Sequence, residues 1–83
     1  MLTDQQVLDR YFPEVRAKLI EIAATMDRLQ RAHADSPQLS LSEDDRMKMF
    51  YESLQVLKDT SDAPDKAERI QMIFSDPHPL PND

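Results

Sequence analysis

The hydrophobic positions of this chain fall into three segments with helical spacing. The longest segment covers residues 13–33, and its apolar residues recur at alternating steps of four and three. Such spacing places them on one face of an α-helix, and a helix with one apolar face needs a partner to cover that face. The residues concerned are Val15, Leu19, Ile22, Met26 and Leu29.

The same spacing continues toward the N-terminus through Leu8 and Phe12. Thr3, with Gln6 three residues later, forms a capping-box pattern that predicts a helix start near residue 4. Pro13 interrupts this segment, because proline lacks a backbone N–H and disfavours helical dihedral angles at the preceding residue. The sequence leaves two alternatives open: a helix kinked at Pro13, or two abutting helices.

A second helix is predicted to end near Lys58. Ser40 and Ser42 are each followed three residues later by an acid, and these overlapping capping boxes predict its start. Its apolar residues at helical spacing are Met47, Phe50, Tyr51, Leu54 and Leu57.

A third helix is expected over residues 64–74, after the break at residues 59–62, because proline is tolerated in a first turn. Its apolar residues are Ala67, Ile70, Ile73 and Phe74. The remaining residues, 77–83, contain three prolines and are expected to form a disordered tail.

The predicted fold is therefore all-α: a long N-terminal helix, kinked or broken at Pro13, packed with two shorter helices in a helical bundle. We expect residues 1–76 to form a single helical domain. A chain of 83 residues has a thin core, and oligomerisation often compensates for that.

Composition excludes several classes of function. The chain has no Gly, which both the P-loop and the dinucleotide-binding fingerprint require, and no Cys, which fits a reducing compartment.

The net charge of the chain is −6, and the whole excess of acids lies after residue 33. Such acidity disfavours binding to nucleic acid or anionic membranes, and no apolar run approaches the length of a membrane span. We expect a cytoplasmic protein.

Candidate chemistry is sparse. His33 and His78 have no potential ligand at helical spacing, so we predict no metal site. The acidic run at residues 43–45 suits the positive end of a helix dipole, which accounts for it without a catalytic role. We therefore expect no enzyme activity, no cofactor and no small-molecule substrate.

One alternative function is a small nucleic-acid-binding regulator with a helix-turn-helix around residues 47–72. The basic and polar residues of its second helix would be Lys66, Arg69 and Gln71. The acids Asp62, Asp65 and Glu68 lie among them and weaken their field, so nucleic-acid binding is the less favoured function.

The favoured function is protein interaction, either as a homodimer or with a helical protein partner. The predicted interface contains the apolar residues of the long helix and one methionine, Met49, which lies off the apolar face of the second helix. These residues are Leu8, Phe12, Val15, Leu19, Ile22, Met26, Leu29 and Met49.

Overall fold

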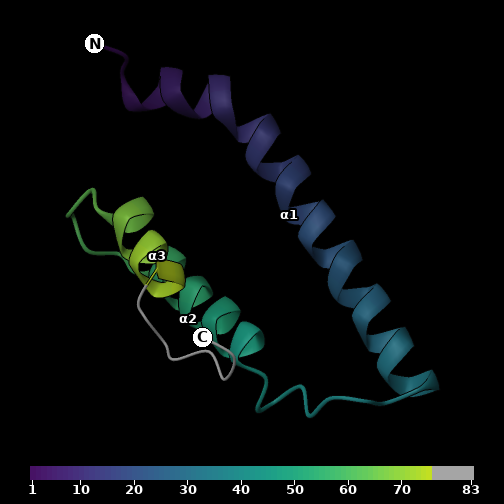
Figure 1. The fold of residues 1–83 in the computed structure, drawn as a ribbon. Helices are drawn as coiled ribbons and strands as arrows, with labels where there is room; N and C mark the ends of the chain where they lie inside the picture. The colour runs from purple at the N-terminus through teal and green to yellow at the C-terminus, as the bar shows by residue number, and fades with distance from the viewer. Residues whose placement is uncertain (76–83) are drawn as a thin grey trace. The chain divides into compact units, whose positions relative to one another are not determined.

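The computed structural model describes residues 1–75, which form three helices and no strand: α1 (Asp4–Asp35), α2 (Asp45–Lys58) and α3 (Lys66–Ser75) (Figure 1). This confirms the all-α class with a long N-terminal helix and two shorter ones. The chain divides into two units, Met1–Gln38 with α1 and the part from Leu39 onward with α2 and α3. A single domain over residues 1–76 stays a prediction, and the expected tail, 77–83, lies outside the described residues.

The first turn of α1 has the predicted capping box. The Thr3 hydroxyl accepts a hydrogen bond from the Gln6 backbone N–H at 3.2 Å, and the Gln6 side chain accepts one from the Thr3 backbone N–H at 2.9 Å. Two backbone donors that the helix itself leaves without partners are thereby satisfied. Asp4 in the same turn adds a carboxylate at the positive end of the helix dipole.

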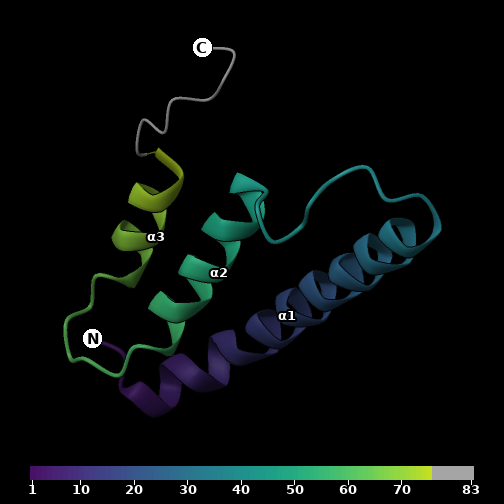
Figure 2. The same cartoon turned by 90° about the horizontal axis from the view of Figure 1, so that it is seen from below.

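α1 runs without interruption through Pro13, which decides between the two alternatives left open by the sequence. The proline ring removes one hydrogen bond and crowds the carbonyl group of Asp9, four residues earlier, so bending is the expected consequence. Both views show α1 bent in its N-terminal third, the part that contains Pro13 (Figures 1 and 2). The helix continues to Asp35, and the backbone N–H of Ser36 caps it by donating to the carbonyl oxygen of Ala32.

The start of α2 differs from the prediction. Its N-cap is Asp44, whose carboxylate accepts from the Arg46 backbone N–H at 2.9 Å, and neither predicted serine caps it. Ser40 instead closes a turn before the helix, where its carbonyl oxygen accepts from the backbone N–H groups of Glu43 and Asp44. Asp caps a helix as well as Ser does, and Arg46 holds this carboxylate in place.

α2 and α3 form an antiparallel hairpin and contact each other (Figure 2). The buried side chains of α2 are Ser53 and Val56, each 8% exposed, whereas Tyr51 and Leu57 of the predicted apolar face are exposed. The Ser53 hydroxyl donates to the Met49 carbonyl oxygen at 2.8 Å, which satisfies it inside the hairpin. The buried face of α2 is thus rotated from the predicted one: Met47, Phe50 and Leu54 of the prediction are half-buried, whereas Tyr51 and Leu57 lie outside it.

Candidate functional site

The first candidate site is the apolar face of α1, here called the α1 stripe. Its seven members share one face because steps of three and four residues nearly match the 3.6-residue turn. The α1 stripe consists of Leu8, Phe12, Val15, Leu19, Ile22, Met26 and Leu29. His33 in the last turn lies at the next position of the same spacing and is half-buried.

The α1 stripe is largely exposed. Its first five members, from Leu8 to Ile22, are between 41% and 59% exposed, and Met26 and Leu29 are half-buried. The unit Met1–Gln38 contains no helix other than α1, so no second element of that unit can cover the stripe. A row of large apolar side chains in this situation is typical of an interaction surface.

Charged residues of both signs border the α1 stripe. Asp9 and Arg16 lie seven residues, or about two turns, apart along one edge, and Lys18 lies along the other edge together with the polar Tyr11. The Asp9 carboxylate also accepts a hydrogen bond from the Gln5 side-chain amide at 3.0 Å. Mixed charge at the edges of an apolar seam is the feature that selects partners and orientation in paired helices.

Met49, the eighth predicted interface residue, lies on α2 and therefore in the other unit. Its side chain is half-buried, not fully exposed. The structure thus brings seven of the eight predicted residues onto one face of one helix and leaves Met49 on a separate element.

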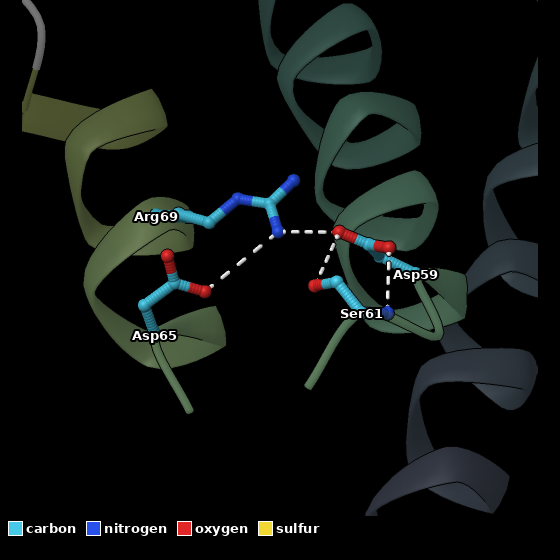
Figure 3. A network of polar contacts seen from close by, with 4 residues as sticks. All are labelled: Asp59, Ser61, Asp65 and Arg69. Carbon is cyan, nitrogen blue, oxygen red and sulfur yellow. Dashed lines mark hydrogen bonds and ion pairs between the residues drawn. The ribbon is translucent and has the colours of Figure 1, made fainter. Parts of the chain in front are cut away.

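A second group of polar residues joins the end of α2 to the start of α3 (Figure 3). The Arg69 guanidinium donates to the Asp59 carboxylate at 2.7 Å, and Ser61 donates to the same carboxylate from its backbone N–H at 3.0 Å and from its hydroxyl at 3.2 Å. Asp65 lies 3.8 Å from the same guanidinium nitrogen. These four residues hold the two ends of the hairpin loop together.

The hydrogen bond from Arg69 is the main cause that lowers the pKa of Asp59, to about 2, and the bonds from Ser61 lower it further. The same contact with Asp59 raises the pKa of Arg69. A carboxylate held ionised by three donors is a weak base, so this group serves as a clamp between helices and does not suit proton transfer. Sequence reasoning missed the clamp because its partners are ten residues apart with no periodic signal.

The acidic run at residues 43–45 also has a structural explanation. Arg46 binds both carboxylate oxygens of Asp44, at 3.0 Å and 2.9 Å, while the same carboxylate caps α2. Hydrogen bonding to the Arg46 side chain is the largest of the effects that lower the pKa of Asp44 to about 2. Asp44 therefore acts as a cap, and Asp45 lies in the first turn of α2.

Binding sites for small ligands are poorly developed in the described part of the chain. A hollow of about 320 Å³ lies beside the start of α1 and is lined by Leu2, Gln6, Asp9 and Arg10. Its lining comes from little more than one turn of α1 and from Leu2, which precedes the helix, so it cannot enclose a ligand as a pocket normally does. Within residues 1–75, no three potential metal-ligating side chains gather at one place, and no helix is both long and apolar enough to cross a bilayer.

The helices of the alternative DNA-binding motif are α2 and α3. The loop between them covers residues 59–65, seven residues, whereas a helix-turn-helix uses a turn of three or four. Arg69 is one of the basic residues on the second helix of that motif, and its guanidinium donates a hydrogen bond to the Asp59 carboxylate. The geometry of this hairpin therefore favours a structural role for α3.

Comparison of the chain with protein-family models, with curated proteins and with solved structures finds no match in any of the three.

Proposed function

We propose that this protein is a small helical interaction module that self-associates through the α1 stripe. The observation that carries the proposal is a row of seven apolar side chains on one face of a 32-residue helix, in a unit that contains no other helix. Helices gain most of their stability from packing of such a face, so an occupant is expected.

A second copy of the chain suits this surface by its charge. Through His33 the five acids of the chain balance five bases, whereas the rest of the chain carries the whole net charge of −6. Two copies of α1 up to His33, the part that contains the stripe, can therefore approach each other without net repulsion, and only Asp35 at the end of the helix adds an unbalanced acid. The regular steps of four and three are also the spacing used when two helices pair along a shallow crossing angle.

Catalysis is not part of the proposal. Asp44 and Asp59, the two carboxylates with strongly lowered pKa values, are each held by an arginine in a structural contact. We place the protein in the cytoplasm, and the absence of Cys fits the reducing conditions there.

Light scattering coupled to gel filtration tests self-association directly. We expect a mass of twice the chain mass of 9.6 kDa at tens of micromolar, falling on dilution. A mass of 9.6 kDa throughout would contradict the proposal and would leave either a different helical protein or the rest of the chain to cover the stripe. A shift in the electrophoretic mobility of DNA that weakens with salt would instead support the alternative function, a small nucleic-acid-binding regulator.

A further inference from the structure

The spacing of the α1 stripe assigns each member a position in the seven-residue repeat of paired helices, whose core positions are called a and d. Phe12, Leu19 and Met26 take the a positions, and His33 follows them at the next a. The d positions are taken by Leu8, Val15, Ile22 and Leu29. The edge positions next to this core then carry Asp4, Tyr11 and Lys18 on one side, and Asp9 and Arg16 on the other.

We propose that the second copy of α1 lies antiparallel to the first, with the middle of the pair between Ile20 and Glu21. This inference rests on the proposed self-association and adds its orientation and register. It assigns every core residue of the stripe an opposite residue in the second copy. The pairs are Phe12 with the partner's Leu29, Leu19 with the partner's Ile22, Met26 with the partner's Val15, and Leu8 with the partner's His33.

A parallel pair fits these residues less well. It would place Leu19 against its own copy at a, and the β-branched Ile22 against its own copy at d, a combination that favours assemblies larger than two. It would also bring Asp4 next to the partner's Asp9, two like charges at the edge of the core. Aligned helix dipoles oppose a parallel pair as well, whereas antiparallel dipoles attract.

Charge also separates the proposed register from the antiparallel register displaced by one repeat toward the N-terminus. Moving the middle of the pair to Ala17 would place Arg16 opposite the partner's Arg16 and Lys18 opposite the partner's Lys18. Both contacts repel, and they lie at the centre of that pair. In the proposed register Arg16 lies near the partner's Ala23 and Lys18 near the partner's Thr25, so this repulsion is absent.

A further shift moves the middle of the pair to the bond between Pro13 and Glu14. That register would place Asp9 near the partner's Arg16, which is favourable, but Leu29 would extend past the end of the partner. It would also place the two Pro13 bends side by side at the centre of the interface. The proposed register instead covers the whole α1 stripe and keeps Pro13 away from the centre.

Spin labels on single cysteines test the orientation, and the natural chain has no Cys that would react. Three exposed positions on the same outer side of α1 are suitable: Glu14, Glu21 and Arg28. At 1.5 Å per residue, the proposed register offsets the two labels along the helix by about 2 Å for Glu21→Cys, about 20 Å for Glu14→Cys and about 22 Å for Arg28→Cys. We therefore expect the shortest distance at position 21 and longer, similar distances at the other two.

Pulsed electron resonance on each labelled full-length chain measures these distances, after light scattering has shown that the mass equals that of the unlabelled chain. Equal distances at all three positions would mean a parallel pair and would overturn the inference. Short distances at positions 14 and 21 with a long one at 28 would mean the register centred on Ala17 and would overturn it too. A monomeric mass of the unlabelled chain would contradict self-association itself, so the two failures are distinguishable.

Discussion

The pair Ile20 and Ile22 offers a sharp test of the α1 stripe. Both are isoleucines in the middle of α1, and they are 53% and 41% exposed, respectively. Ile22 belongs to the stripe, whereas Ile20 lies on the outer side of the helix. Ile20→Asp and Ile22→Asp therefore change the chain in the same way, with the same loss of helix propensity, and differ only in the face that receives the charge.

The expected loss of dimer stability in Ile22→Asp follows from the exposure of Ile22. Full burial of an isoleucine side chain is worth about 1.5–3 kcal/mol, so covering the remaining 41% is worth roughly 0.6–1.2 kcal/mol per chain. A dimer contains two copies, which gives about 1.2–2.5 kcal/mol. Because 1.4 kcal/mol corresponds to a tenfold change, Ile22→Asp should weaken the dimer by about tenfold or more. Desolvation of the two introduced carboxylates adds to this loss.

The assay is the mass by light scattering over a dilution series, with circular dichroism to follow helix content. We expect Ile22→Asp to shift the series toward the monomer and Ile20→Asp to follow the natural chain. Equal weakening by the two variants would show a general effect on the helix and refute the assignment of the stripe. An unchanged dimer with Ile22→Asp would refute it as well.

Two further predictions concern the hairpin of α2 and α3. Because the pKa of Asp59 is lowered to about 2 from the usual 3.8, its contribution to stability is complete above about pH 4 and is lost as the pH falls toward 2. Urea unfolding of Asp59→Asn should therefore depend less on pH across this range than that of the natural chain, and parallel curves would contradict the clamp. Val56→Ala removes two buried methyl groups and should lower the free energy of unfolding by about 1.6 kcal/mol, whereas Leu57→Ala, at a site 53% exposed, should cost clearly less in the same assay. Equal losses would show that Val56 is not the buried side of α2.

The sequence predicted those features that depend on residues three or four apart. The capping box of Thr3 and Gln6, the long extent of α1 and the membership of the α1 stripe all follow from local spacing. The all-α class follows for the same reason, because hydrogen bonds within a helix join neighbours in the sequence.

Other features depended on geometry that local spacing does not carry. The sequence left α1 kinked or broken at Pro13, since proline permits both, and the structure has a continuous bent helix. Three nearby residues can cap α2 almost equally well, and the structure uses Asp44.

Only the tertiary structure decided which side of α2 is buried and what joins it to α3. Ser53 is a small polar residue that no hydrophobic pattern selects, and its burial is tolerated because its hydroxyl donates to the Met49 carbonyl oxygen in its own helix. The contact of Arg69 with Asp59 spans ten residues and requires the chain to reverse direction between them. Periodicity reports the faces of a single helix, whereas these contacts depend on where a second helix lies against it.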